Sequence, residues 1–214
     1  LRSQRGVMTR CLSNSRRAVS AANTRVSRVK VRSFTHGNLM SYLFWRHVVL
    51  NTRNSWLHGD PRGFRDRHHR IHSSGDYHNP PPAGQHAGLH AWYTARAGEK
   101  VVFERDSWSR IGLALRQKAK DLDRSILAIA VGPVHVHLVI ELPSDLALCR
   151  SEIGFCKRAA TDAVKDCIRG KLWAQGGSFR VVRDKEHLAN SINYVVFKQH
   201  PAWTWNYRDG ERYT

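Results

Sequence analysis

The chain of 214 residues is long enough for one domain with a full hydrophobic core, and its 41% hydrophobic content is typical of a globular protein. No apolar run approaches the roughly 20 residues of a membrane-spanning helix, which argues against an integral helical membrane protein. The net charge of +18 favours a polyanionic partner, most simply nucleic acid, over a membrane surface.

The first 39 residues differ in composition from the rest. Residues 1–59 contain 11 basic and no acidic side chains, whereas residues 60–214 carry 24 basic and 17 acidic ones, an excess of seven. We therefore expect residues 1–39 to be a basic, disordered leader, followed by a folded domain over residues 40–214. A transit peptide, a basic arm that binds nucleic acid, and upstream sequence carried into the reading frame are alternatives.

The four cysteines form no C-x-x-C pair and show no metal-ligand spacing. Three of them, Cys149, Cys156 and Cys167, fall in one stretch with helical periodicity. This pattern favours reduced thiols packed as small apolar side chains. It therefore indicates an intracellular protein.

Hydrophobic periodicity predicts alternating strands and helices along the folded domain. The expected elements are a strand at 42–50, a loop-rich insertion at 51–103, a helix at 104–123, a strand at 125–131, a strand ending at Pro143, a helix at 146–169, a glycine-interrupted strand region at 172–182 and a helix from Asp184 to about His200. The core order is β-α-β-β-α-β, which is the ferredoxin-like pattern. We expect an α+β fold with an antiparallel sheet, a long insertion after the first strand and a C-terminal tyrosine-bearing helix.

Two groups of side chains are candidates for nucleic-acid contacts. An aromatic and several arginines in the insertion could stack on bases and grip phosphates, and three cations lie on the predicted helix 146–169. The candidate residues are Trp56, Arg62, Arg65, Arg67, Lys157, Arg158 and Lys165. A plain solvated face explains the helix cations equally well. The seven histidines of the insertion have no consistent ligand spacing, which favours a solvated loop.

The strand that contains His135-Val136-His137 carries the strongest chemical signal. Side chains alternate across a strand, so both histidines project from one face, with Glu141 further along the same face. Two parallel imidazoles suit one divalent metal ion. A buried strand with two satisfied histidines is the structural alternative, and strand-end solvation is the alternative for Glu141.

The last predicted helix carries a tyrosine away from its apolar stripe. At 100° per residue, Leu188, Ile192 and Val195 form the buried stripe and Tyr194 lies off it. The face of Tyr194 also carries His187, Ser191 and Lys198. A tyrosine among polar neighbours is a candidate nucleophile or binding group, and a surface tyrosine is the alternative.

These residues resemble those of the HUH single-tyrosine transposases, which include the TnpA-like insertion-sequence enzymes and the REP-associated tyrosine transposases. The resemblance rests on the Gly132-Pro133 turn, the histidine pair, the tryptophan-glycine strand region and Tyr194, and it covers roughly residues 42–201. The segment from Ser55 to Phe64 is similar to a loop in a REP-associated subgroup.

The resemblance implies that residues 40–214 form a ferredoxin-like, HUH transposase-like catalytic domain. It implies that His135 and His137 bind Mg²⁺ or Mn²⁺ and that Tyr194 attacks a phosphodiester of single-stranded or hairpin DNA, which leaves a 5′-phosphotyrosine link and a free 3′-hydroxyl. Such chemistry needs a cation to neutralise the phosphate and to activate a phenol whose pKa is ordinarily near 10. A bacterial, cytoplasmic, nucleoid-associated protein is then expected, and some relatives share their active sites in a homodimer.

One position departs from the family pattern. Members usually carry Asn or Gln four residues after the tyrosine as a third metal ligand, whereas this chain has Lys198 there and Gln199 one residue later. Lysine is a poor ligand but could lower the pKa of the tyrosine or hold phosphate. Gln199 could reach the metal through a helix irregularity, or two histidines with water and DNA could suffice, or activity could have decayed.

Two other functions therefore stay open beside the DNA strand transferase. One is a domesticated protein that binds DNA hairpins without cleaving them. The other is a metal-dependent nuclease that uses water and leaves Tyr194 without a chemical role.

Overall fold

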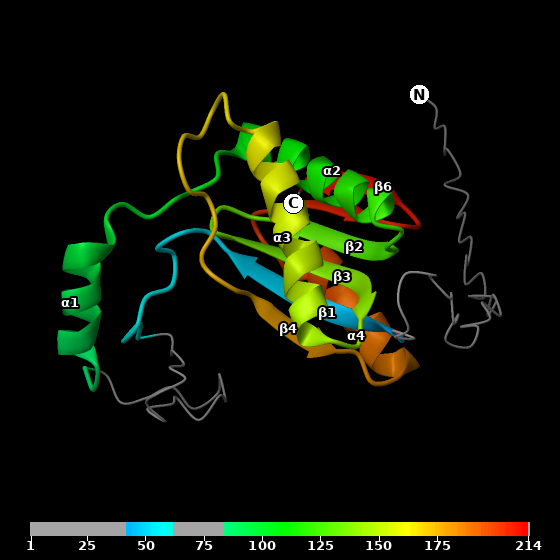
Figure 1. Cartoon of the computed structure of the whole chain (residues 1–214), viewed down its shortest axis with the longest axis horizontal. Coiled ribbons are helices and arrows are strands. Elements are labelled where there is room, and N and C mark those ends of the chain that lie inside the picture. The colour runs from blue at the N-terminus through cyan, green and yellow to red at the C-terminus, as the bar shows by residue number, and fades with distance from the viewer. Residues whose placement is uncertain (1–41, 62–83, 214) are drawn as a thin grey trace, which may run out of the picture.

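The strand with the histidine pair lies at the centre of an antiparallel sheet (Figure 1). The computed structural model describes residues 42–61 and 84–213. The elements, in chain order, are β1 (Leu43–Asn51), α1 (Ala87–Ala97), α2 (Arg105–Asp121), β2 (Ile126–Val131), β3 (His135–Pro143), α3 (Leu146–Ala163), β4 (Ser178–Val181), α4 (Lys185–Phe197), β5 (Trp203–Asn206) and β6 (Gly210–Tyr213).

The sheet has six strands in the order β4-β1-β3-β2-β5-β6, and every neighbouring pair is antiparallel. Its first four strands have the order of a ferredoxin-like sheet, and they are connected by α2 and α3 in the β-α-β-β-α-β sequence. The hairpin of β5 and β6 extends this core beyond β2. The predicted α+β class and core order are confirmed.

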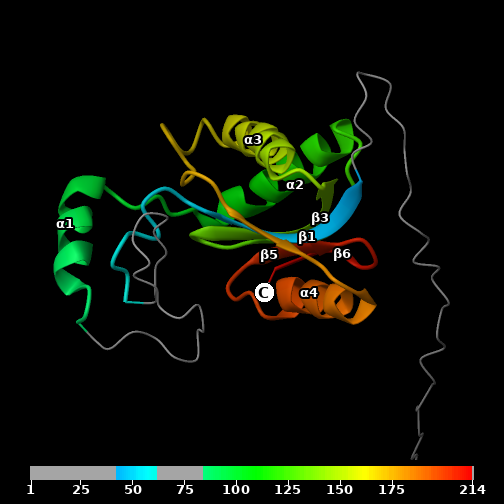
Figure 2. The same ribbon diagram turned by 60° about the horizontal axis from the view of Figure 1, so that its bottom comes forward.

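Helices cover both faces of the sheet (Figure 2). The larger core cluster lies between the sheet and helices α2 and α3, and includes Val136, Leu138 and Ile140 of β3. A smaller cluster on the other face joins Val139 of β3 to Val195 of α4. Alternation along β3 therefore sends Val136, Leu138 and Ile140 into the larger core, and the two histidines, with Val139, toward the face that α4 covers.

Specific side chains set the starts of α3 and α4. Asp145 precedes α3 and its carboxylate accepts a hydrogen bond from the backbone N–H of Leu148 at 2.7 Å. Asp184 does the same for α4, accepting from His187 N–H at 2.7 Å. These carboxylates satisfy backbone donors that have no partner within the helix. The predicted start of the last helix at Asp184 is confirmed.

Three expectations about the elements are corrected. The insertion contains helix α1, in which Leu89, Trp92 and Tyr93 have helical spacing but no residue is buried. The expected helix 146–169 ends as α3 at Ala163, and turns follow to Cys167 and Ile168. The expected strand region 172–182 forms only the four residues of β4 and a single bridge between Thr52 and Trp173.

The hairpin of β5 and β6 was also missed. Both strands are only four residues long and follow Pro201, where the expected elements ended. Trp203 of β5 is fully buried because it fits against Gly112 of α2, where a Cβ atom would lie 1.9 Å from the indole ring. The contact joins residues 91 positions apart, so no local pattern could reveal it.

Some expectations lie outside the described residues. These are the basic leader, with the domain boundary at residue 40, and the candidate arginines Arg62, Arg65 and Arg67. In the described ranges, no helix combines the length and the apolar character that crossing a membrane would require.

Candidate active site

Three histidines gather on the face of the sheet that α4 covers. His135 and His137 belong to β3, and His47 belongs to the adjacent strand β1. In the antiparallel register Val49 lies opposite His137 and His47 lies opposite Val139, so His47 and His137 are diagonal neighbours on one face. The sheet itself therefore adds a third imidazole to the predicted pair.

The imidazoles are in direct contact. Nε2 of His47 lies 3.0 Å from Nδ1 of His137, and the two rings are stacked with their centroids 5.2 Å apart. The rings of His135 and His137 are nearly perpendicular at 87°, with centroids 4.9 Å apart. His137 is 6% exposed, whereas His47 and His135 are half-buried.

Helix α4 brings Tyr194 to the histidines. Val195 and Val196 anchor the helix in the smaller core cluster, and the adjacent Tyr194 is left 46% exposed. Its ring lies edge-on to both His137 and His47, at centroid distances of 5.7 and 5.8 Å. Because Tyr194 lies off the apolar stripe, as predicted, its ring is beside His137 and His47.

The end of α4 brings Gln199 into the same site. The helix ends at Phe197, and Lys198 N–H donates to the Tyr194 carbonyl at 3.1 Å as the helix cap. Beyond this point the chain no longer follows the helical angle. Oε1 of Gln199 lies 3.2 Å from Nε2 of His135, and Gln199 is only 8% exposed. A helix end, rather than an irregularity inside the helix, gives Gln199 its access to His135.

A cavity of about 200 Å³ opens between the start of β3 and the segment that follows α4. Its side-chain polar groups come from His135, His137, Lys198, Gln199 and His200. The cavity therefore has imidazole, amide and ammonium groups around one space, which is a suitable composition for an anionic ligand with a bound cation.

Burial keeps two of the imidazoles neutral. It lowers the pKa of His137 to about 3, with a further contribution from His135 and His47. It also lowers the pKa of His47 to about 4, to which the charges of Arg180 and His187 add. Each ring therefore carries one N–H and one lone pair at neutral pH, and the neutral imidazole is the form that ligates metals.

The donor set fits a divalent metal ion. Two atoms that each lie about 2.1 Å from one ion are about 3.0 to 3.4 Å apart at octahedral or tetrahedral angles, and the pair of His135 and Gln199 is 3.2 Å apart. Among the described residues no group of three or more His, Cys, Asp or Glu side chains is arranged to hold a metal. The fit therefore depends on the amide oxygen of Gln199 beside the two imidazoles.

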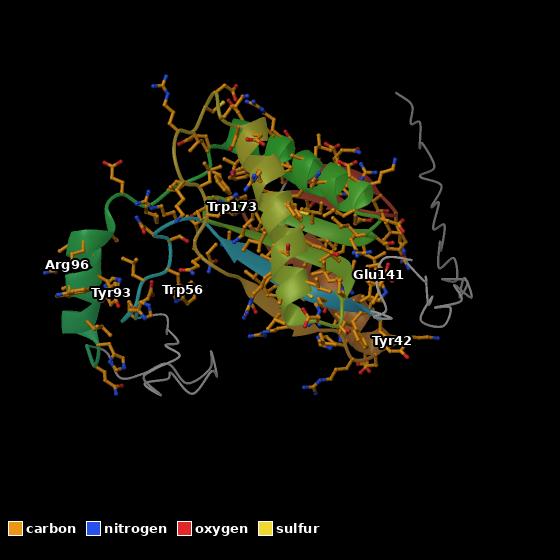
Figure 3. The ribbon with its side chains drawn as sticks, viewed as in Figure 1. Tyr42, Trp56, Tyr93, Arg96, Glu141 and Trp173 are labelled. Carbon is orange, nitrogen blue, oxygen red and sulfur yellow. The ribbon has the colours of Figure 1, made fainter. Side chains whose placement is uncertain are left out.

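The other sequence candidates lie elsewhere. Glu141 is at the far end of β3, four residues from His137 and so about 13 Å along the strand, close to Tyr42 (Figure 3). Trp56 is in the loop that begins at the His135 end of the sheet, where Thr52 N–H donates to the Val134 carbonyl at 2.9 Å, and Figure 3 shows it on the side of α1. Neither side chain lines the cavity at the histidines.

Helix α3, which carries the candidate cations Lys157 and Arg158, lies on the opposite face of the sheet from α4 (Figure 2), and Lys165 follows two residues after its end. Lys157 donates from Nζ to the carbonyls of Ala174 and Gly176 at 3.1 and 2.5 Å, and burial lowers its pKa to about 8. Its ammonium holds the loop before β4 rather than facing solvent. Arg158 and Lys165 are exposed, but the structure does not bring them to the histidines.

Sequence reasoning missed His47. A single histidine in a strand has no spacing that marks it as part of a site. The available signal was the order of the elements: β1 and β3 are neighbours in a ferredoxin-like sheet, so a histidine on the matching face of β1 lies next to the pair.

No protein-family model matches the chain, and no curated protein matches it. A solved structure of a REP-associated tyrosine transposase bound to a REP hairpin is similar over 77% of this chain and 70% of that one, with 15% identity and a TM-score of 0.39.

Proposed function

We propose that this chain is a metal-dependent enzyme that nicks and rejoins single-stranded or hairpin DNA through Tyr194. The observation that carries the proposal is the position of the Tyr194 ring, 5.7 Å from the ring of His137 and 5.8 Å from that of His47, at a half-exposed site. The net charge of +18 supports a polyanionic substrate.

His135, His137 and Gln199 would hold the ion, which we expect to be Mg²⁺ or Mn²⁺. When bound, the ion neutralises and orients a non-bridging oxygen of the scissile phosphate. The histidines contribute lone pairs because burial keeps His137 neutral. Gln199 contributes its amide oxygen from the end of α4, so the ligands and the nucleophile belong to adjoining segments.

The proposed reaction exchanges one phosphoester bond for another. The Tyr194 oxygen forms a bond to phosphorus, the bond from phosphorus to the 3′-oxygen breaks, and the phenolic proton is lost while the departing 3′-oxygen gains one. The product is a 5′-phosphotyrosine and a free 3′-hydroxyl, which can attack in the reverse direction to rejoin a strand. Because the bond energy is conserved, no nucleotide cofactor is required.

Lys198 provides the cation closest in sequence to the nucleophile, and it lines the cavity with His135 and Gln199. We propose that its ammonium contacts the phosphate or the developing phenolate. This role would explain how a lysine can replace the amide usually found four residues after the tyrosine. The metal-ligand function would then belong to Gln199.

The proposal is tested with single-stranded DNA hairpins labelled at the 5′ or the 3′ end, incubated with protein and Mg²⁺ or Mn²⁺ and separated on a denaturing gel. Wild type is compared with Tyr194→Phe, with His135→Ala combined with His137→Ala, and with Tyr207→Phe. Tyr207 is a matched control because it is 44% exposed but lies in the turn between β5 and β6.

We expect a protein band carrying the 3′ label in wild type and in Tyr207→Phe, and its loss in the other two variants. Cleavage that persists in Tyr194→Phe without a covalent band would replace the proposal with a water-dependent nuclease. Hairpin binding without cleavage by any variant would favour a protein that only recognises DNA.

A further inference from the structure

His47 occupies a position between the proposed nucleophile and a proposed metal ligand. Its ring stacks on His137, its edge contacts the ring of Tyr194, and its Nε2 lies 3.0 Å from Nδ1 of His137. His47 does not line the cavity that His135, His137 and Gln199 share. It is therefore behind His137 as seen from the cavity.

One proton makes the hydrogen bond between Nε2 of His47 and Nδ1 of His137, and it belongs to one of the two rings. If Nδ1 of His137 donates to Nε2 of His47, then Nε2 of His137 keeps its lone pair and can bind a metal. If the proton instead belongs to His47, Nε2 of His137 carries a hydrogen and cannot bind one. The direction of this one hydrogen bond decides whether His137 is a ligand.

We propose that His47 is a positioning residue that accepts a hydrogen bond from Nδ1 of His137 and so fixes the tautomer and ring orientation in which Nε2 of His137 faces the cavity. The inference rests on the proposed metal-binding role of His137. Hydrogen-bond acceptors behind a ligating histidine are a general means of orienting it.

Because His137 is buried, few other groups could replace His47 as the hydrogen-bond acceptor. His137 is 6% exposed, and its ring contacts the rings of His135, His47 and Tyr194. Water therefore has little access to replace a lost hydrogen-bond acceptor. Within the described residues, His47 is the hydrogen-bond partner of Nδ1 of His137. Removal of the acceptor would leave a buried N–H without a partner, or reverse the tautomer.

Two substitutions separate the acceptor from the ring. His47→Phe keeps an aromatic ring against His137 and Tyr194 but removes the acceptor, whereas His47→Gln removes the ring and keeps an amide oxygen that can accept. His58→Gln is the control, because His58 stacks on Tyr93 of α1 and belongs to a different part of the structure.

The first readout needs no metal. Two-bond ¹H–¹⁵N correlation spectra of the full chain with ¹⁵N-labelled histidine distinguish the two tautomers, and the His137 signals are those missing in His137→Ala. We expect Nδ1–H in the wild type and in His47→Gln, and a shift to Nε2–H in His47→Phe. A wild-type His137 protonated on Nε2, or one unchanged in His47→Phe, would overturn the inference.

The second readout is Mn²⁺ binding to the same proteins by calorimetry. We expect His47→Phe to weaken binding by about 10- to 100-fold, and His47→Gln and His58→Gln to stay close to wild type. Equal affinity of His47→Phe and wild type would also contradict the inference. A wild type that binds no Mn²⁺ would refute the proposed function instead, and the wild-type tautomer, which needs no variant, would still decide the role of His47.

Discussion

Oε1 of Gln199 lies 3.2 Å from Nε2 of His135, although the two residues come from the end of α4 and the start of β3. The distance is the one expected for two ligands of a single ion. Both residues line a cavity that is also lined by Lys198 and His137. In the proposed metal site this amide oxygen is the third ligand, beside His135 and His137.

Two different substitutions of Gln199 should therefore change the metal affinity in opposite directions. We expect Gln199→Ala to weaken Mn²⁺ binding about tenfold or more, and Gln199→Glu to strengthen it because a carboxylate adds a negative charge to the donor set. Calorimetric titration of the full chain measures both, with Gln175→Ala in the exposed loop before β4 as the control. If wild type and the three variants bind Mn²⁺ with the same affinity, Gln199 is not a metal ligand.

Lys198 should affect the rate of covalent attachment and not the binding of metal. Its ammonium lines the cavity but is not a metal donor, so Lys198→Ala loses charge stabilisation while the ligand atoms are kept. We expect the single-turnover rate of protein–DNA attachment to fall about 10- to 100-fold, with Mn²⁺ affinity close to wild type. The control is Lys185→Ala at the first position of α4. Equal attachment rates for Lys198→Ala and wild type would contradict the role.

The contact between α2 and β5 predicts opposite effects for two helical glycines. A Cβ atom at Gly112 would lie 1.9 Å from the Trp203 ring, so Gly112→Ala should destabilise the fold by about 1–3 kcal/mol or more. Gly154 of α3 has open space around it, and Gly154→Ala should be neutral or stabilising by up to about 1 kcal/mol. Urea unfolding measures both. Similar midpoints for the two variants would contradict the packing of Trp203 against α2.

Acid should destabilise the metal-free fold partly through His47 and His137. The pKa of each is lowered in the folded state, to about 4 and about 3, from an ordinary value of 6.5, mainly by burial. At pH values between about 4 and 6.5, the two histidines bind protons in the unfolded chain but not in the folded chain. The stability contributed by the neutral rings is therefore complete above pH 6.5 and is lost as the pH falls toward 4.

The measurement is the urea midpoint between pH 7 and pH 4 for wild type and for the double variant His47→Gln with His137→Gln. Carboxylates and other groups titrate in both proteins, so the difference between the two curves isolates the two imidazoles. We expect the wild type to lose more stability than the variant over this range. Parallel curves would show that burial does not lower the pKa values of these two histidines.

The core of the fold could be predicted because it depends on local patterns. The alternation in β3 and the 3.6-residue stripe of α4 are both readable within short windows. Together they separated His135, His137 and Tyr194 from the apolar core residues around them. Helix α4 lies outside the β-α-β-β-α-β order, so the expectation that Tyr194 joins the histidines rested on the resemblance to the single-tyrosine transposases.

What could not be predicted depends on contacts between distant segments or on where a helix stops. Trp203 is buried through Gly112, and His47 becomes part of the site only through the register of β1 against β3. On a helix that continued to residue 199, Gln199 would project about 140° away from Tyr194. Because α4 ends at Phe197, Gln199 turns toward His135.

The most direct test of the proposed function is to identify the residue that becomes attached to DNA. Wild-type protein incubated with a cleavable hairpin and Mn²⁺ is denatured, its DNA is trimmed by nuclease to a short remnant, and the remnant is located on a proteolytic peptide by tandem mass spectrometry. We expect a phosphodiester-linked remnant on Tyr194. Cleaved hairpin with no adduct, or an adduct on any other residue, would contradict the proposed role of Tyr194 as the nucleophile.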